Sequence, residues 1–472
     1  MEENFDLEND TLPLSLEKNL PEAEEISEML KAKRYSEIRG LSADIPAPDL
    51  AVLLEALTKE ERASIYRLLS KDQASEVFAE LDFELAEELI GIFTDNELKQ
   101  ILAELYIDDT VDMIEEMPAV VVKRILKNSS PENRSIINEL LRYPKDSAGT
   151  IMTTEYVRLK ADMTVSDALA HIRKVAIDKE TIYNCYVTDN SRRLIGVVSA
   201  KRMLISALDT PISEIMEESL IFAVTSEDRE VVAGKIEKYG FIALPVVDNE
   251  GRLVGIVTVD DAMDVLREEA EEDFAKMAAI IPSEREYLKT SAFSIYKARI
   301  PWLLILMISA TFSSAILGFF EASLIPVLVL FVPMLMDTGG NSGSQASVTA
   351  IRGLSTGEVT PGDVLKILSK EFLVGVMLGL TLGAVAFAKV LVVDGMIFAN
   401  SAVTATVAFA VSISLALTIV AAKIIGSTLP FLAKRLGLDP AVMASPFITT
   451  LVDVVGLIMY FAVSSYAFGL TV

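Results

Sequence analysis

Hydrophobic positions in the first third of the chain recur at helical spacing and are interrupted about every dozen residues. Between residues 22 and 143, leucines repeat at the intervals of amphipathic helices. Breaks such as Thr94-Asp95 and Met117-Pro118 separate these helices. The predicted helices cover residues 49–69, 71–81, 84–93, 96–105, 110–117, 119–126 and 131–141. Because such short helices cannot bury a core singly, we expect an all-α superhelix of helical hairpins over residues 22–146.

The middle of the chain holds two copies of one unit at a constant offset of 59 residues. Tyr186-Val187-Thr188-Asp189 matches Pro245-Val246-Val247-Asp248, and residues 194–199 match residues 253–258. Each copy predicts a helix, a strand, a turn, a strand and a helix. A repeat of this kind resembles a tandem pair of CBS domains, an α+β fold, here over residues 147–207 and 208–266.

The second copy carries the spacing Gly255, Thr258 and Asp261. This spacing resembles the ribose and phosphate corner at which some CBS pairs bind adenine nucleotides such as ATP. The first copy has Arg202 where the second has Asp261. The resemblance therefore allows a nucleotide at one site, with Thr258 and Asp261 as contacts; the alternative is a CBS pair that binds none.

A charged helix follows the repeat, from residue 260 to about residue 279. Its acidic side chains are Asp261, Asp264, Glu268, Glu269, Glu271, Glu272 and Asp273. An acidic helix is usually a solvated face. This one joins the polar half of the chain to a hydrophobic half, and a second amphipathic piece follows at residues 283–299. We therefore predict a connecting helix over residues 267–299.

Five apolar stretches make up the rest of the chain, at residues 301–320, 324–352, 364–393, 403–425 and 441–467. All except the second are long and apolar enough to span a bilayer. Residues 300–472 therefore predict a five-helix transmembrane domain. Residues 1–21 are polar and without pattern, and we expect them to be flexible.

Lysine and arginine mark one side of the predicted spans. They are Lys289, Lys297, Arg299, Arg352, Lys366, Lys370, Lys434 and Arg435. The loops at 321–323 and 394–395 on the other side contain neither. The positive-inside rule then predicts cytoplasmic N-terminal domains and an outside C-terminus in a plasma (inner) membrane protein.

Two of the spans carry polar groups at membrane depth. The second contains Asp337-Thr338-Gly339-Gly340-Asn341, which predicts a broken or opened helix whose carbonyls and Asn341 amide face water or an ion. A close-packing glycine motif is the alternative. In the fifth, Ser445, Thr449, Asp453 and Gly456 share one helical face.

Asp453 lies near the middle of an apolar segment, where a carboxylate costs about 2.5–3.5 kcal/mol on insertion scales. We interpret the stripe as the lining of an ion path. The alternative is a structural polar residue that hydrogen-bonds a neighbouring helix.

Charge and composition narrow the function. The whole chain carries a net charge of −26, and residues 300–472 contain 7 basic and 8 acidic residues, so residues 1–299 carry −25. Nucleic acid is excluded as a partner because its phosphates would be repelled. With one Cys and one His, any metal must be held by oxygen ligands, which favours Mg²⁺ or Ca²⁺, with Mn²⁺ a further candidate. We find no nucleophile–base pair, P-loop or cofactor fingerprint, so an enzyme is not expected.

Several motifs together resemble the MgtE family of magnesium channels and transporters. They are Arg299-x-Pro301-Trp302-Leu303, Gly339-Gly340-Asn341-x-Gly343-x-Gln345, Asp439-Pro440-Ala441 and Pro446-Phe447-x-Thr449-Thr450-x-x-Asp453. The order of domains agrees with that family, and the resemblance covers the chain from about residue 50 onward. It implies magnesium import across the plasma membrane through a homodimeric pore on a two-fold axis.

The resemblance also implies roles for residues. Asp453 matches the family's selectivity aspartate, which holds hydrated Mg²⁺, and Thr449 matches the neighbouring pore position. Asn341 and Asp337 are further candidates for the pore. The resemblance does not assign a role to Asp337 beside Asp453. The implied regulatory Mg²⁺ positions are Glu76, Asp108, Asp112, Gly149, Asp228, Glu230, Asp261, Asp264, Glu269, Glu272, Asp273 and Asp439. Asp109 competes with the helical-domain positions, and Gly240 stands where the family has an acidic residue, so that site is absent or rebuilt around Glu237.

Feedback is the mechanism that this arrangement predicts. Without Mg²⁺ the clustered carboxylates repel; with Mg²⁺ bound they attract, and the connecting helix closes the pore. Two alternatives stay open: a less selective path for Mn²⁺, Co²⁺ or Ca²⁺, and a membrane-tethered CBS protein that senses a nucleotide.

Overall fold

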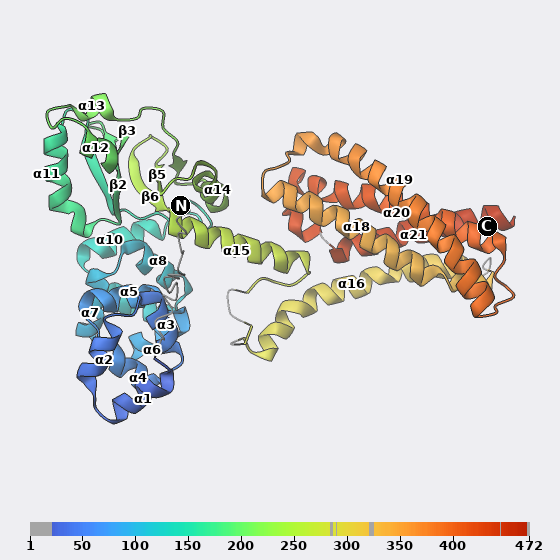
Figure 1. The fold of residues 1–472 in the computed structure, drawn as a ribbon, viewed down its shortest axis with the longest axis horizontal. Coiled ribbons are helices and arrows are strands. Elements are labelled where there is room, and N and C mark those ends of the chain that lie inside the picture. The colour runs from blue at the N-terminus through green and yellow to red at the C-terminus, as the bar shows by residue number, and fades with distance from the viewer. Residues whose placement is uncertain (1–20, 284–286, 289, 321–324, 444, 470–472) are drawn as a thin grey trace, which may run out of the picture. The chain divides into compact units, whose positions relative to one another are not determined.

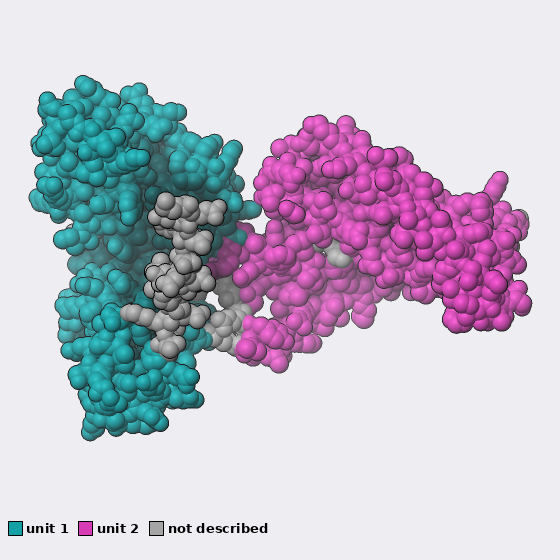
Figure 2. All heavy atoms as spheres, viewed as in Figure 1, with its two compact units in different colours: residues 1–266 teal, residues 267–472 magenta. Residues whose placement is uncertain are grey.

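The computed structural model describes residues 21–283, 287–288, 290–320, 325–443 and 445–469. It divides into two compact units, residues 1–266 and residues 267–472 (Figure 2). Residues 1–20 of the predicted flexible segment lie outside the described residues, as do Lys289 and the predicted loop at 321–323.

The first unit begins with a helical domain (Figure 1). Its helices are α1 (Ala23–Lys31), α2 (Tyr35–Ser42), α3 (Ala47–Glu55), α4 (Lys59–Tyr66), α5 (Lys71–Ala79), α6 (Phe83–Ile92), α7 (Asp95–Glu104), α8 (Ile107–Glu116), α9 (Ala119–Asn128) and α10 (Pro131–Leu140). The prediction of short amphipathic helices is confirmed, with one correction: residues 49–69 form two helices. The chain breaks before Thr58, whose hydroxyl and backbone N–H both donate to Glu61 and so cap α4.

Local capping explains why these helices end where they do. At the predicted break before α7, the backbone N–H of Thr94 donates to the Glu97 carboxylate over 2.7 Å, and the Glu97 N–H donates back to the Thr94 hydroxyl over 3.2 Å. The apolar faces then pack into a shared core that includes Leu54, Phe78 and Leu98. Helices that cannot bury a core singly thus bury one together.

Two small sheets form the rest of the first unit. One contains β1 (Tyr156–Lys160), β2 (Thr181–Thr188) and β3 (Leu194–Ser199), and the other contains β4 (Ala223–Val224), β5 (Ala243–Val247) and β6 (Leu253–Thr258). The helices that accompany these sheets are α11 (Val165–Val175), η1 (Ala176–Asp178), α12 (Ala200–Ile205), α13 (Ile212–Ile215) and α14 (Arg229–Tyr239).

The internal repeat is visible in the strand register. Tyr186 pairs with Val197 in the first sheet, and the equivalent Pro245 pairs with Ile256 in the second. The sequence pattern missed β1 and β4, each of which runs parallel to the central strand of its sheet. β1 alternates between buried and exposed positions but has only five residues, and β4 has only two, so each is too short to stand out in the pattern.

The connecting helix α15 (Val259–Met277) begins in the first unit and ends in the second. The second predicted amphipathic piece, at 283–299, is not a separate helix: α16 (Ala292–Phe320) begins within it and continues through Pro301 as one long helix. The remaining elements are α17 (Pro326–Val329), α18 (Val332–Ser355), η3 (Pro361–Asp363), α19 (Val364–Lys389), η4 (Val390–Ile397), α20 (Ala405–Arg435), η5 (Pro440–Met443) and α21 (Ser445–Phe468).

Four helical segments among the described residues are long and apolar enough to cross a membrane. They are Ala292–Phe320, Pro361–Ile397, Ala405–Arg435 and Pro440–Phe468. The predicted second span is not among them, since α18 carries many polar and small residues. The second unit is therefore a helical, membrane-spanning domain, and its predicted count of five spans is not reached by length and hydropathy alone.

The predicted opening of the second span at its glycines is wrong. The glycines lie inside α18, which is a continuous helix of 24 residues, and the interruption comes earlier, between α17 and α18. A Cβ on Gly340 would come within 2.8 Å of the Thr449 side chain, and one on Gly343 within 2.9 Å of Ile448. The glycines therefore serve close packing of α18 against α21, which was the alternative interpretation.

Small residues also bring α19 against α20. Gly375, Gly379 and Gly383 face the backbone of α20, where a Cβ on Gly379 would come within 2.8 Å of a carbonyl oxygen. Beside this contact the ammonium of Lys423 on α20 lies 3.8 Å from the carboxylate of Glu371 on α19, and Lys423 is only 5% exposed. A buried ion pair therefore joins the two helices.

Candidate cation path and acidic cavity

The polar residues of α18 form one exposed face. Asp337, Asn341 and Gln345 follow each other at four-residue spacing and are all exposed, whereas Gly339, Gly340 and Gly343 on the other side are buried. Since a helix in lipid normally exposes apolar side chains, an exposed polar face in a membrane domain marks a water-filled path or an interface.

α21, which carries two of the predicted pore residues, packs against α18. Thr449 packs against Gly340, the residue before Asn341. Asp453, one turn further along α21, is half-buried, and its Oδ1 atom is buried without a hydrogen-bond partner among the described residues. Gly456 packs instead against Thr418 of α20, and the side chain of Ser445 lies outside the described part of the chain. Thr449 thus packs against the glycine side of α18, and Asp453 follows it on α21.

The first unit contains a cavity of about 530 Å³ between its helical domain and its CBS pair. Carboxylates dominate the lining: Glu76, Glu80, Glu104, Asp108, Asp109, Glu180, Asp260 and Asp261. Three predicted regulatory residues, Glu76, Asp108 and Asp261, therefore meet around one space. Asp112 lies one turn beyond Asp108 on α8 and is exposed. We refer to this space as the acidic cavity.

Three carboxylates lie closest together at the acidic cavity. Oxygen atoms of Asp108, Glu155 and Glu180 all fall within 4.8 Å of one another. Glu155 and Glu180 are neighbours because they precede the paired parallel strands β1 and β2, where the Glu180 N–H donates to the Glu155 carbonyl over 2.9 Å. Carboxylates at this spacing suit a hard divalent cation.

Burial and mutual repulsion raise the pKa values of these groups. Burial, followed by the Asp109 carboxylate, raises the pKa of Asp108 to about 7. Burial, followed by Asp108, raises the pKa of Glu180 to about 8. Asp108 is 6% exposed, and its Oδ1 and the Glu180 Oε2 are buried without a hydrogen-bond partner among the described residues. A bound cation would relieve both effects.

The CBS side of the acidic cavity is formed by the end of β6 and the start of α15. The Thr258 hydroxyl donates a hydrogen bond to the Asp261 carboxylate there. Burial, followed by Asp108, raises the pKa of Asp261 to about 7. The two residues predicted to contact a nucleotide are therefore together, and Asp261 also faces the carboxylates of α8. Asp264, one turn further along α15, is exposed. The partial burial of Glu80, followed by the Asp264 carboxylate, raises the pKa of Glu80.

Other predicted regulatory positions lie outside the acidic cavity. Asp228 caps α14, where its Oδ1 accepts hydrogen bonds from the Glu230 and Val231 N–H groups. The N–H of Gly149 donates to the Thr225 carbonyl oxygen over 3.0 Å. A Cβ at Gly149 would clash with the Tyr143 ring. Gly240 ends α14 with φ of +64°, a left-handed conformation that favours glycine over the acidic residue expected there.

The second unit holds the remaining predicted positions near the end of α15. The Lys276 ammonium contacts Glu272 over 2.5 Å and Asp439 over 2.6 Å. Partial burial lowers the pKa of Lys276, but the hydrogen bonds to Asp439 and Glu272 together outweigh it and raise the pKa to about 12. The Ser355 hydroxyl donates to Asp273 over 3.0 Å, and Glu269 lies one turn earlier on α15. The structure therefore brings Glu272 and Asp439 together around a lysine.

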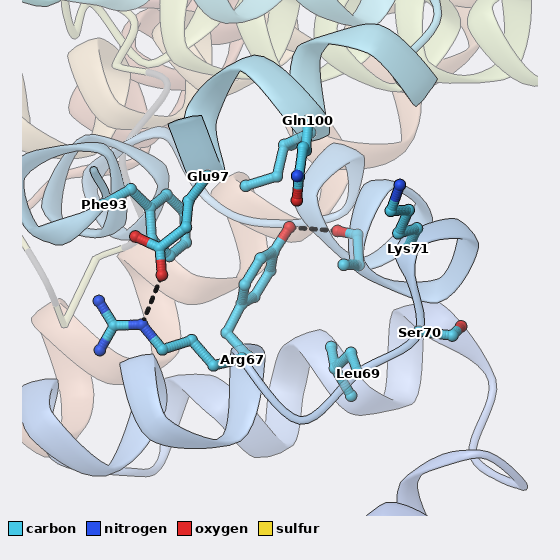
Figure 3. A pocket seen from close by; sticks show the side chains of 10 residues that line it. Arg67, Leu69, Ser70, Lys71, Phe93, Glu97 and Gln100 are labelled. Carbon is cyan, nitrogen blue, oxygen red and sulfur yellow. Dashed lines mark hydrogen bonds and ion pairs between the residues drawn. The ribbon is translucent and has the colours of Figure 1, made fainter. Parts of the chain in front are cut away.

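A second pocket, of about 290 Å³, lies within the helical domain. In Figure 3, Arg67 and Glu97 point toward each other across it, and their ion pair measures 2.8 Å. Its lining is mixed, with Phe93, Lys71 and Gln100, and contains none of the predicted regulatory residues. It does not have the chemistry of a divalent cation site.

Sequence reasoning missed Glu155, Glu180 and Lys276. The two glutamates directly precede β1 and β2, whose pairing the pattern did not reveal. Lys276 was visible four residues after Glu272, a spacing that predicts a helical ion pair. Its contact with Asp439 joins residues 163 positions apart and depends on the tertiary fold.

Comparison with protein-family models covers most of the chain. Residues 45–146 match the MgtE intracellular N domain, residues 148–208 and 212–268 match the CBS domain, and residues 332–463 match the divalent cation transporter model of MgtE. The soluble part of a magnesium transporter, a crystal structure, matches 52% of this chain and 98% of its own with 32% identity and a TM-score of 0.50. The cytosolic domain of the Mg²⁺ channel MgtE in complex with ATP matches 52% of this chain and 99% of its own with 38% identity and a TM-score of 0.49.

Curated relatives match over nearly the full length. A magnesium transporter MgtE of Thermus thermophilus is 37% identical over 93% of this chain and 97% of its own. A magnesium transporter MgtE of Bacillus subtilis is 31% identical over 93% of this chain and 95% of its own. On these similarities and the order of its domains, the chain belongs to the MgtE family of magnesium transporters.

Proposed function

We propose that the chain carries Mg²⁺ into the cytoplasm across the plasma membrane, through a path beside α18 and α21, and that cytosolic Mg²⁺ closes this path. The observation that carries the proposal is Asp453. Its carboxylate has a buried oxygen without a hydrogen-bond partner among the described residues, on an apolar helix that packs against α18. A cation is the partner that offsets such a cost in a membrane domain.

The chemistry of the path favours a hydrated ion. Mg²⁺ loses its water reluctantly, so a carboxylate that holds it through water suits it better than a dry cage. Asp453, Thr449 and Asn341 offer a carboxylate, a hydroxyl and an amide, all of which hydrogen-bond water. Asp337 adds a second carboxylate to the α18 polar face, where it would raise the local concentration of cations.

α18 serves as a fifth span in this proposal. Its 24 residues reach about 36 Å at 1.5 Å per residue, enough to cross a hydrocarbon core of about 30 Å. Its low hydropathy follows from the polar face. With five spans and basic residues on one side, the N-terminal domains are cytoplasmic and the C-terminus is outside. Labelling of a cysteine introduced at Tyr466 by a membrane-impermeant reagent from outside tests this orientation; protection from outside would contradict it.

A homodimer follows from the same polar face. Asp337, Asn341 and Gln345 would be costly against lipid, and a second copy related by a two-fold axis would cover them with its own polar face. Two Asp453 carboxylates would then share one path. Light scattering in detergent tests the dimer, and a monomeric mass would contradict it. The division into flexible N-terminus, helical domain, CBS pair, connecting helix and membrane domain belongs to this proposal.

Regulation is proposed to act through the acidic sites. Mg²⁺ in the acidic cavity would neutralise the repulsion among Asp108, Glu180 and Asp261 and favour one arrangement of the first unit. Glu272, Asp273 and Asp439 would act at the other end of α15, and Gly149, Asp228 and Glu230 at a further edge. The ligand biases closure only by its higher affinity for the closed state. Uptake that stays fully sensitive to internal Mg²⁺ after deletion of residues 1–280 would contradict this.

An adenine nucleotide at the CBS pair is a second candidate ligand. The Thr258 hydroxyl donates to the Asp261 carboxylate at the end of β6, so the two residues that would contact the nucleotide lie together. Binding of ATP to the full chain, with and without Thr258→Ala, tests it; equal binding by both would contradict the assignment. The alternative is a membrane-tethered protein whose only activity is nucleotide sensing by the CBS pair. In that case Asp453→Ala would leave the phenotype of the cells unchanged.

Growth rescue tests the proposed transport. Wild type is expected to restore growth of a Mg²⁺-import-deficient bacterium in low Mg²⁺, and Asp453→Ala is not, because it removes the carboxylate from the path. Glu358→Gln, at an exposed position of the same unit, is the control that removes one acidic charge. Rescue by Asp453→Ala at equal membrane abundance would overturn the proposal.

A further inference from the structure

A lysine side chain lies between two of the acidic residues at the end of α15. The Lys276 ammonium is 2.5 Å from the Glu272 carboxylate and 2.6 Å from Asp439 Oδ2. The side chains of all three residues are partly buried, with exposed fractions of 24%, 36% and 34%. The contact is therefore partly shielded from solvent, unlike an ion pair on an open surface.

Local structure fixes both partners of this lysine. Glu272 is four residues before Lys276 on α15, so the two side chains share a helical face. Asp439 stands at the start of η5, where its Oδ1 accepts a hydrogen bond from the Ala441 N–H over 2.8 Å, so that Oδ2 is left for the ammonium. Met277 packs beside Ile351 and Ala441. The end of α15 is thus docked on α18 and η5 with the ammonium at the contact.

We propose that the Lys276 ammonium is a tethered competitor of the divalent cation at Glu272 and Asp439, and that it sets the Mg²⁺ concentration at which transport stops. The proposal rests on the regulatory role proposed for these carboxylates. A carboxylate oxygen that accepts a hydrogen bond from an ammonium is a weaker ligand for a metal at about 2.1 Å, because the ammonium already neutralises part of its charge. The two cations also repel each other at this distance. Mg²⁺ affinity is therefore lowered by the strength of the lysine contacts.

The test measures half-inhibitory cytosolic Mg²⁺ for transport by the full chain in proteoliposomes. Lys276→Gln is expected to lower this concentration about twofold to fivefold, the range expected when a partly exposed, ion-paired lysine loses its charge. Lys276→Arg keeps a cation at the contact and is expected to behave much like wild type. Lys366→Gln is the matched control, because Lys366 is also ion-paired, to Asp363 over 2.8 Å, in the same unit.

A second readout separates regulation from block of the path. Mg²⁺ is expected to protect the exposed Phe274 of α15 from chymotrypsin, and the protecting concentration should fall in Lys276→Gln by the same factor. In an Asp439→Asn background the Lys276→Gln shift should shrink, because the site that the lysine competes for is weakened.

The outcomes are distinguishable. An unchanged or higher half-inhibitory concentration in correctly assembled Lys276→Gln, with wild type inhibited by Mg²⁺, would overturn this inference and leave the proposed function standing. Absence of inhibition in wild type would overturn the proposed feedback and this inference with it. A shift of equal size in Lys366→Gln would reduce the effect to net charge and would also overturn the inference.

Discussion

Buried carboxylate oxygens carry most of the chemistry of this chain at the scale of single residues. Asp108, Glu180 and Asp453 each have a buried oxygen without a hydrogen-bond partner among the described residues. Asp453 was predicted from its position alone, because any carboxylate in an apolar segment is costly. Asp108 and Glu180 become buried and unpaired only when the fold brings α8 close to the start of β2. No local sequence pattern therefore predicts Glu180.

The raised pKa values at the acidic cavity predict a dependence of local stability on pH. A carboxyl whose pKa is about 4 when unfolded and about 7 or 8 when folded, as for Asp108 and Glu180, binds more protons in the folded chain between these values. The free energy of local unfolding therefore falls as pH rises from about 4 to about 8. With a chelator present, we expect α8 to be better protected at pH 6 than at pH 8.

Hydrogen exchange of the full chain measures this, after correction for the intrinsic effect of pH on exchange. Mg²⁺ should restore the protection of α8 most strongly at pH 8, where the carboxylates are charged. Asp108→Asn should reduce the pH dependence, and α11, which lies outside the acidic cavity, provides an internal control. Equal protection of α8 at both pH values would contradict the assigned shifts.

At the scale of elements, the sequence predicted helices better than strands. Helix breaks were predictable because capping residues such as Thr94 and Glu97 are only three positions apart in the chain. β1 and β4 were missed because such short parallel strands form through pairing with a strand elsewhere in the chain, β2 and β5 respectively. The glycines of α18 were wrongly predicted to open the helix. Their effect depends on which element packs against them, and in the structure α21 packs there.

The ion pair between α19 and α20 gives a prediction at this scale. Glu371→Gln leaves the Lys423 ammonium buried without its charged partner, and loss of one member of a buried pair costs roughly 3–5 kcal/mol. The folded fraction that survives heating in detergent should fall sharply. Glu371→Gln combined with Lys423→Met should recover most of it, because the pair is then removed as a whole. Equal thermal resistance of the single and double variants would rule out this role for the pair.

The whole molecule combines an acidic unit with a nearly neutral membrane unit. The net charge of −25 over residues 1–299 and the oxygen-only ligand set were readable from composition, and both indicated hard cations. The meeting of Glu76, Asp108 and Asp261 around one cavity supports a sensor in the first unit. Which carboxylates meet was not readable from composition, since Glu155 and Glu180 join them only through the pairing of β1 and β2.

The central claim is that Asp453 holds the transported Mg²⁺ in the membrane. The most direct test is Mg²⁺ flux into proteoliposomes that contain the purified chain, with Mn²⁺, Co²⁺ and Ca²⁺ as competitors. We predict saturable Mg²⁺ flux for wild type that an excess of the other ions inhibits only weakly, and a loss of about tenfold or more in Asp453→Asn, as expected when a buried charge contact worth roughly 1.4 kcal/mol or more is removed. Equal Mg²⁺ flux through wild type and Asp453→Asn would contradict the account.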